Sequence, residues 1–328
     1  MLVRPVAEAL ETAGIVETMV RRSCQTSNAG AQSPAWQAVY VFHDTSDESL
    51  LCFELVPLML EELERGRVDA FFFIRYWEGG KHLRLRFRSD DPDVIARLRR
   101  RLSRASTDNG TRPRIRPGEY EPEIERYGGP ACIGLCDTHF MLSSFHVWSR
   151  LRPNLRLAPD DLLRRVRLPA AAHDMMMIVR HAYGEPRPAI EFLRSYWNGW
   201  LLPSGAGRHE RARELRRVLE REMDHQFGRI GDELKTHLLG AWRLRPDRTA
   251  EGLEGGPAEA YLAPADWSAG TASILAALRR AGLDFRSAAG KRSISGLIHM
   301  NNNRFGVLNR DEAFLAYLCE RTLREAHA

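Results

Sequence analysis

The stretch that decides the fold is Phe71-Phe-Phe-Ile-Arg-Tyr-Trp-Glu-Gly-Gly-Lys-His-Leu-Arg-Leu-Arg-Phe-Arg88, in which two β-like runs flank Gly79-Gly80. Glycine reaches positive φ without strain, so a glycine pair between two such runs predicts a hairpin. Successive side chains on a strand point to opposite faces. The second run therefore presents leucine and phenylalanine on one face, and on the other it presents four basic residues: His82, Arg84, Arg86 and Arg88.

In the first run, Phe72, Ile74 and Tyr76 share a face, and Arg75 lies on the opposite face with its phenylalanine neighbours. A hairpin with such a basic face is unusual. The arginines are either solvated or arranged to bind anions, and we keep both interpretations at this point.

The composition is that of a folded, water-exposed protein. The 328 residues are 44% hydrophobic, which is enough for a large core. No apolar run approaches the roughly eighteen residues of a membrane span, so we expect no membrane association. The acidic first twenty residues do not resemble a signal peptide. Five scattered cysteines indicate a reducing compartment, and we expect a cytoplasmic location.

The positive charge is carried almost entirely by arginine. The formal charge is +5, and the only lysines are Lys81, Lys235 and Lys291. Arginine's planar fork matches carboxylates and phosphates in two-point contact, although GC-rich codon usage also produces an arginine bias. The modest charge and an expected lack of aromatic residues on the Arg84 face argue against direct nucleic-acid binding.

Hydrophobic periodicity and turn residues predict an α+β fold. In it, an antiparallel or mixed sheet with an Arg-lined hairpin occupies the N-terminal part and packs against a predominantly helical C-terminal half. The expected elements up to residue 120 are a helix over 1–23, a flexible connection over 23–34, a strand over 36–42, a helix from Asp47 as N-cap to about Arg65, the hairpin, a helix to about Ala105 and an edge strand over 111–117. The helices expected after it are 130–151, 159–183, 187–200, 207–239, 268–282, 291–303 and 310–326.

This pattern suggests a short N-terminal extension followed by one domain. Residues 1–35 form the helix and its flexible connection, and residues 36–328 form a single domain with a sheet-containing part (36–120) and a mainly helical part (121–328). Strands 36–42 and 111–117 are candidates for pairing with a peptide at a sheet edge.

Two further stretches carry candidate functional residues. In Tyr120–Pro130, Gly128-Gly129 permits a chain reversal and Pro130 can open a helix, so Arg126 lies where a helix start favours an anion. A surface ion pair with a neighbouring glutamate is an equal interpretation of Arg126. In Ser295–Gly306, the three asparagines predict the end of a helix close to His299, where a histidine is more often a cap or a packing residue than a catalyst.

We find no sign of a cofactor or a metal. The sequence has no Gly-rich phosphate loop, no dinucleotide fingerprint and no His-Glu-x-x-His. Cys132, Cys136 and His139 lack a visible fourth ligand, and cysteines in an apolar helix are usually packing residues.

Taken together, three segments resemble the C-terminal, glutamate-elimination domain of lantibiotic dehydratases, which also occurs as a separate thiopeptide-type bacteriocin biosynthesis protein. The segments are Phe72–Arg86, Tyr120–Gly129 and His299–Gly306, within a resemblance that runs from about Trp36 to Leu323. The resemblance implies an enzyme that expels glutamate from glutamylated Ser or Thr of a precursor peptide, giving dehydroalanine or dehydrobutyrine. The chain is too short to glutamylate as well, so the implied partners are the peptide, with its leader and core, and a separate glutamyl-tRNA-dependent enzyme.

The resemblance also implies a set of site residues. The matched positions are His299, Arg84, Arg86 and Arg126, with His299 as general acid or base and the arginines on glutamate and on the developing charge. Arg75, His82, Tyr127 and Arg304 are expected as additional substrate-binding residues.

Two other functions fit the same resemblance. Pyridine synthases of thiopeptide pathways use this fold for a formal [4+2] cyclisation of two dehydroalanines with loss of the leader peptide. They have no leaving glutamate to bind, so the four filled positions favour elimination. A non-catalytic, peptide-binding partner is the third candidate, and a homodimer is compatible with all three.

Overall fold

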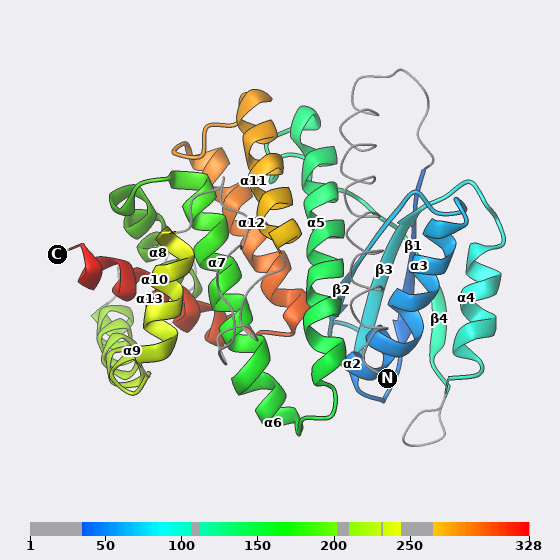
Figure 1. Ribbon diagram of the computed structural model, residues 1–328, viewed down its shortest axis with the longest axis horizontal. Coiled ribbons are helices and arrows are strands. Elements are labelled where there is room, and N and C mark those ends of the chain that lie inside the picture. Colours follow the sequence, from blue (N-terminus) through cyan, green and yellow to red (C-terminus); the bar gives the residue numbers. More distant parts are fainter. Residues whose placement is uncertain (1–34, 106–111, 202–209, 231, 244–264, 328) are drawn as a thin grey trace. The chain divides into compact units, whose positions relative to one another are not determined.

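The computed structural model describes residues 35–105, 112–201, 210–230, 232–243 and 265–327 (Figure 1). The expected helix over 1–23 and the connection after it lie outside these residues. The described strands are β1 (Trp36–Phe42), β2 (Ala70–Tyr76), β3 (His82–Arg88) and β4 (Arg114–Gly118). The described helices are α2 (Asp47–Leu50), α3 (Val56–Glu64), α4 (Val94–Leu102), α5 (Pro130–Leu151), α6 (Pro159–Leu162), α7 (Leu168–Tyr183), α8 (Pro186–Leu201), α9 (Glu210–Gly228), α10 (Asp232–Arg243), α11 (Ala265–Arg280), α12 (Ala288–Phe305) and α13 (Asn309–Ala326). Short helical turns of other pitch are η1 (Leu51–Leu55), η2 (Arg152–Asn154) and η3 (Leu163–Arg167).

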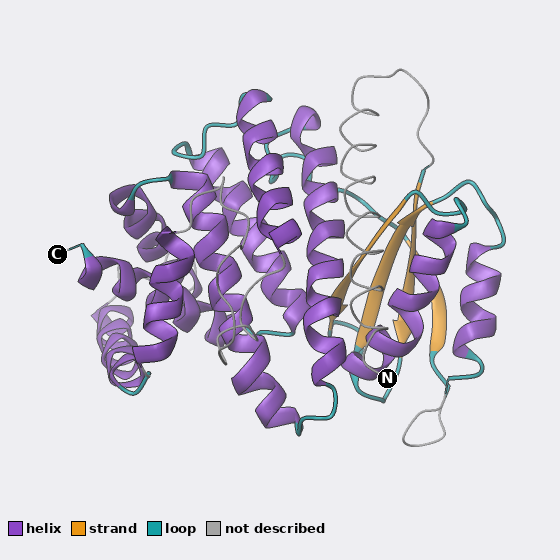
Figure 2. Cartoon of the chain, viewed as in Figure 1, coloured by secondary structure: helices purple, strands orange, loops and turns teal. Residues whose placement is uncertain are grey.

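The chain divides into two compact units. The first contains the sheet and consists of the residues up to Glu125 together with Gly129–Ala158, and the second joins Arg126–Gly128 to the helices from Pro159 onward. Figure 2 shows the strands gathered in one part of the chain, with helices making up most of the rest. The strands precede most of the helices along the sequence, so the expected α+β class is confirmed. The expected single domain over 36–328 stays a prediction.

The sheet of the first unit is antiparallel throughout, with strand order β2-β3-β1-β4. The predicted hairpin is present, with Tyr76 opposite His82. Its connection spans residues 77–81 and is longer than the two glycines alone, which adopt φ of 76° and 106°. Strand β4 is an edge, as predicted. Strand β1 lies between β3 and β4, so peptide addition at 36–42 is excluded.

One face of the sheet forms the core of this unit. Its apolar side chains are at most 1% exposed: Val39, Val41, Phe71, Phe73, Leu83, Leu85 and Phe87. In Figure 1, α3 crosses over the strands and α4 lies beside β4. Arg75 shares this face and bonds to Asp47 of α2, so α2 lies over this face. The first run of the hairpin therefore buries Phe71, Phe73 and Arg75 on this face.

Helix α5 packs beside β2. The backbone N–H of Phe73 donates to Ser144 Oγ at 3.3 Å, and the rings of Phe71 and Phe145 lie 5.1 Å apart, edge to face. Pro130 opens the helix at its first turn, as predicted. Gly128 and Gly129 immediately before it have φ of 91° and 94°, which confirms the predicted chain reversal.

Several helix boundaries differ from the sequence prediction. Ser46, and not Asp47, caps α2, because its hydroxyl accepts from the Ser49 N–H. The expected helix 207–239 is two helices, α9 and α10. Helix α12 continues through the three asparagines to Phe305, since Asn301 is buried and donates to Asp174 at 2.9 Å. Such tertiary contacts outweigh the low helix propensity of asparagine.

The second unit is helical in its described residues and centres on α7. Helices α8, α10, α11, α12 and α13 all contact α7, and the Met175-Met176-Met177 run is buried there, as predicted. The guanidinium of Arg167 donates to the carbonyls of Phe305 and Gly306 at the end of α12, where helix carbonyls lack partners. No helix in the described residues is both long and apolar enough to cross a membrane.

Candidate active site

The face of the sheet opposite the core holds the alternating arginines predicted from the sequence. The guanidinium of Arg84 lies between two tyrosine rings, 3.3 Å from the centroid of Tyr76 and 4.8 Å from that of Tyr40. Gly118 on the edge strand makes room for Tyr40, because a Cβ there would lie 2.4 Å from the ring. Stacked aromatic rings hold a guanidinium in one plane and leave its in-plane donors for an anion.

Arg86 has a similar frame. Its guanidinium lies 4.7 Å from the ring of Tyr120 and 5.5 Å from that of Phe72. Its Nε is buried and has no hydrogen-bond partner among the described residues, and burial lowers the pKa of the side chain. A buried donor without a partner is costly, so this guanidinium is suited to a carboxylate ligand.

The aromatic frame corrects one inference from the sequence. We expected no aromatic residues on the Arg84 face, but Tyr40, Tyr76, Phe72 and Tyr120 all contact its arginines. The argument against nucleic acid therefore loses this part of its support. The absence of nucleic-acid binding stays a prediction that rests on the modest net charge alone.

His82 acts on Arg84 through its ring nitrogens. The Nε of Arg84 donates to His82 Nε2 at 3.2 Å, and because arginine only donates, Nε2 is the acceptor. The proton is then on Nδ1, which donates to the Gly80 carbonyl at 2.7 Å. This tautomer makes His82 an anchor for Arg84, with neither nitrogen left for substrate.

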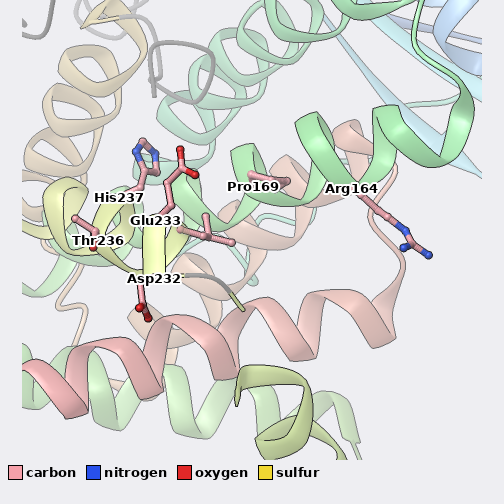
Figure 3. Close-up of a pocket in the computed structure, with 7 residues that line it drawn as sticks. Arg164, Pro169, Asp232, Glu233, Thr236 and His237 are labelled. Carbon is pink, nitrogen blue, oxygen red and sulfur yellow. The ribbon is translucent and has the colours of Figure 1, made fainter. Parts of the chain in front are cut away.

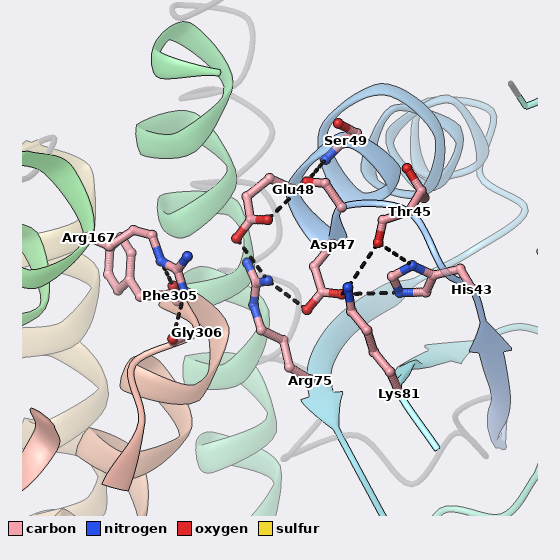
Figure 4. A network of polar contacts seen from close by, with 11 residues as sticks. His43, Thr45, Asp47, Glu48, Ser49, Arg75, Lys81, Arg167, Phe305 and Gly306 are labelled. Atoms are coloured by element: carbon pink, nitrogen blue, oxygen red, sulfur yellow. Dashed lines mark hydrogen bonds and ion pairs between the residues drawn. The ribbon is translucent and has the colours of Figure 1, made fainter. Parts of the chain in front are cut away.

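Arg75 lies on the core face, away from Arg84 and Arg86. Its Nη1 contacts Asp47 Oδ2 at 2.8 Å and Glu48 Oε1 at 3.1 Å (Figure 4). His43 and Lys81 contact the same aspartate at 3.2 and 3.1 Å. Burial opposes ionisation of Asp47, but the His43 hydrogen bond and the two cations outweigh it and hold its pKa well below the usual range. This network gives Arg75 a structural role, so we leave it out of the proposed site.

In the second unit, His299 is oriented by a carboxylate that the sequence analysis missed. Its Nδ1 lies 2.9 Å from Oε2 of Glu312 on α13, which is fully buried. The Tyr196 hydroxyl donates to the other oxygen of Glu312. Burial and then the Glu312 charge raise the pKa of Tyr196 well above its ordinary value, so this hydroxyl stays a donor.

The histidine ring is held by packing as well as by hydrogen bonding. The ring of Trp200 lies 5.1 Å from that of His299, while the histidine side chain remains 24% exposed. Because Glu312 accepts from Nδ1–H, the neutral ring presents the lone pair of Nε2. This arrangement of carboxylate, imidazole and open nitrogen suits general acid–base chemistry.

Arg126 lines a cavity of about 270 Å³ in the same unit, together with Tyr196, Trp200 and Lys291. The Ser293 hydroxyl donates to the Arg126 carbonyl at 3.0 Å and so fixes the Arg126 backbone to α12. Among the residues that the structure describes, two cations and no acidic residue line the cavity, which favours an anionic group.

Tyr127 and Arg304, both expected to bind substrate, are buried. Tyr127 is 2% exposed and packs on Gly296, where a Cβ would come within 2.7 Å of its ring. Arg304 is 0% exposed, and its Nη1 donates to the Met300 carbonyl at 2.8 Å. Tyr127 thus positions Arg126, and Arg304 stabilises the end of α12.

A second cavity, of about 490 Å³, lies between α7, η3 and α10 (Figure 3). Asp232, Glu233 and His237 come to it from α10, and Arg164 comes from η3. No residue predicted for the site lines it. Within the described residues, no group of three or more His, Cys, Asp or Glu side chains is placed to hold a metal ion.

The structure adds Asp137 to the first unit's set of polar residues. Its Oδ1 accepts from the Tyr120 hydroxyl at 2.6 Å. Burial raises its pKa to about 6, against the opposing effects of Tyr120, Arg88 and Arg86. Asp137 and Glu312 both lie within helices that the sequence identifies by their apolar periodicity, and nothing local distinguishes them from surface acids.

Comparison with known proteins identifies the family of the chain and proteins that share its fold. The family model described as "Lantibiotic biosynthesis dehydratase C-term" matches residues 36–323. The pyridine synthase TbtD from thiomuracin biosynthesis has a similar fold, with a TM-score of 0.61 and 16% identity over 89% of this chain and 98% of that one. TsrL aligns with a TM-score of 0.59 and 18% identity over 89% and 95%. The tRNA dependent lantibiotic dehydratase MibB from Microbispora sp. 107891 aligns with a TM-score of 0.56 and 20% identity over 91% of this chain and 29% of that one. No curated protein sequence matches the chain.

Proposed function

Because the chain belongs to the family of lantibiotic biosynthesis dehydratase C-terminal domains, we propose that it expels glutamate from glutamylated Ser or Thr residues of a precursor peptide. The reaction removes the α-proton, breaks the Cβ–O bond and forms the Cα=Cβ double bond. Glutamate leaves as a carboxylate. Elimination therefore needs a proton acceptor and groups that bind an anion. The first unit supplies the arginines Arg84 and Arg86 for the anion, and the second unit supplies His299 as the proton acceptor and Arg126 as a further anion-binding residue.

The observation that carries the proposal is the state of Arg86. Its guanidinium is framed by aromatic rings, and its buried Nε lacks a partner in the described part of the chain. The leaving carboxylate supplies the acceptor oxygens that this group lacks, and a charge-assisted contact there stabilises negative charge as it develops. Arg84, which His82 and two tyrosines hold in place, has the same role.

His299 takes the α-proton in this proposal. Its Nε2 is the basic atom, Glu312 stabilises the imidazolium that forms, and Trp200 fixes the ring plane. Arg126, in the cavity of the same unit, binds a carboxylate of the glutamyl group.

The proposed substrate is already glutamylated when it reaches this chain. We propose that a separate enzyme glutamylates the peptide and that this chain receives the product. The chain aligns with 29% of the length of MibB. The work of this chain needs no cofactor.

A pyridine synthase is the second candidate. TbtD carries that description and matches this chain over 98% of its own length, whereas MibB is far longer. A [4+2] cyclisation releases no carboxylate, and the anion-binding arginines have no evident part in it. For this reason elimination is the first choice.

The two functions are distinguished with two synthetic substrates. The chain is incubated with a glutamylated precursor peptide, and free glutamate and peptide mass are measured. We expect glutamate release and the corresponding mass loss. If no glutamate appears and a bis-dehydroalanine peptide is converted to a macrocycle with loss of its leader, the cyclase assignment replaces ours. Binding without either reaction would show a non-catalytic partner.

A further inference from the structure

Asp137 lies beside the proposed anion-binding arginine and has no part in the mechanism above. It stands on α5, and its Oδ1 accepts from the hydroxyl of Tyr120 at 2.6 Å. The ring of Tyr120 in turn lies 4.7 Å from the guanidinium carbon of Arg86. The carboxylate thus fixes the ring on which the guanidinium stacks.

The groups that face Asp137 come from three elements besides its own helix. Arg86 and Arg88 come from β3, Trp36 from β1 and Tyr120 from the segment before α5. On its own helix, Cys136 is adjacent. Burial raises the pKa of Asp137 to about 6, against the hydrogen bonds and the two cations, so its charge changes near neutrality.

We propose that Asp137, acting through Tyr120, positions the guanidinium of Arg86 and becomes protonated when a carboxylate binds there. The inference rests on the proposed role of Arg86. A bound carboxylate adds negative charge beside Asp137, which makes its ionised form more costly. The aspartate then takes a proton from solvent. Neutral Asp137 no longer attracts the charge of Arg86, so the guanidinium interacts with the ligand alone.

Calorimetry with free L-glutamate tests the proposal. Binding is measured at pH close to 6, in MES and in imidazole, because the two buffers differ in ionisation enthalpy and the difference in heat reports proton transfer. For the native chain we expect uptake of part of a proton for each glutamate bound. Asp137→Asn should show none and should bind glutamate up to about tenfold more tightly at higher pH, since the competing charge is gone.

Two further variants sharpen the test. Tyr120→Phe keeps the ring under Arg86 and removes the hydrogen bond that favours ionised Asp137, so proton uptake should move to higher pH. Glu54→Gln is the matched control. It removes another carboxylate of the same unit, one that pairs with Arg101 at 2.6 Å, and it should retain native proton uptake.

Three results would overturn the inference: glutamate binding without proton exchange, equal proton uptake by Asp137→Asn, or no glutamate binding at all. Glutamate release from the glutamylated peptide is measured separately. Release without proton-linked binding leaves the proposed function intact, whereas proton-linked binding without release leaves the anion site intact and removes the elimination activity.

Discussion

The two ring nitrogens of His299 face different surroundings. Nδ1 meets the buried Glu312, while the side chain as a whole keeps 24% exposure. A histidine that merely capped its helix would need no such partner. The carboxylate sets the tautomer and stabilises the charge that a proton would bring, and so it should affect turnover more than binding.

Glu312→Gln should lower the rate of glutamate release by about 10- to 100-fold with little change in KM, as part of the roughly 10²- to 10⁴-fold effect of a positioned acid–base group. The matched control is Glu320→Gln on the same helix. Glu320 is also buried but pairs with Arg194 at 2.7 Å. Steady-state kinetics on the glutamylated peptide measure both variants. Equal turnover of the two would contradict the role of Glu312.

The two faces of the hairpin should respond differently to loss of an arginine. Arg75→Ala leaves Asp47 buried beside fewer cations and should reduce the free energy of unfolding by about 3 to 5 kcal/mol. Arg86→Ala should stop glutamate release with a much smaller effect on stability. Urea unfolding and the release assay measure the two quantities. If Arg86→Ala lowers the urea midpoint as far as Arg75→Ala, the assignment of Arg86 to substrate is wrong.

At the scale of elements, the Arg126 segment packs closely on α12. Gly296→Ala would favour the helix by about 0.5 to 1 kcal/mol, but its Cβ meets the ring of Tyr127 at 2.7 Å. We therefore expect a net loss of stability and a raised KM, because Arg126 is displaced. Gly134→Ala on α5, where nothing lies within 4 Å of the new Cβ, should raise the melting temperature. A gain in both variants would show that Tyr127 yields without cost.

Most elements were predictable from the sequence because their signals are local. The hairpin glycines, the proline at the start of α5 and the apolar periodicity of the helices all lie within the elements that they specify. The end of α12 was not predictable, since the contact of Asn301 with Asp174 on α7 is tertiary. The break between α9 and α10 was missed although Gly228 ends the first helix and Asp232 begins the second.

The candidate site was predictable only in part. Resemblance supplied the four matched residues, and strand alternation placed Arg84 and Arg86 on one face. The partners that fix them are distant in sequence: Tyr40 beside Arg84, Asp137 beside Tyr120 and Glu312 beside His299. Periodicity says which face a residue occupies, but it does not say what packs against that face.

At the scale of the whole molecule, Asp137 makes stability depend on pH. Its pKa is raised from 3.8 to about 6, so between these values the folded chain holds a proton that the unfolded chain has released. Stability therefore falls as pH rises through this window. In Asp137→Asn this fall should be absent. Relative to the native chain, the free energy of unfolding of the variant should therefore rise by up to about 3 kcal/mol as the pH goes from 4 to 7. Urea unfolding of both proteins at pH 4 and pH 7 measures this difference. The prediction is wrong if the free energies of unfolding of the two proteins change by the same amount between these pH values.

The two compact units are not consecutive segments of chain. The backbone leaves the first unit after Glu125, contributes Arg126–Gly128 to the second, and returns at Gly129. Two contacts hold those three residues on α12. The Ser293 hydroxyl donates to the Arg126 carbonyl, and the ring of Tyr127 packs against Gly296.

No single cut of the polypeptide can therefore separate the units cleanly. A fragment that begins at Pro159 would lack Arg126 and would leave the surface of α12 at Gly296 uncovered. Insertions and gene fusions that treat residue 158 as a domain border would separate Arg126, a proposed substrate-binding residue, from the rest of the second unit. Any ancestral recombination of the two units would have had to carry this short crossing segment along with it.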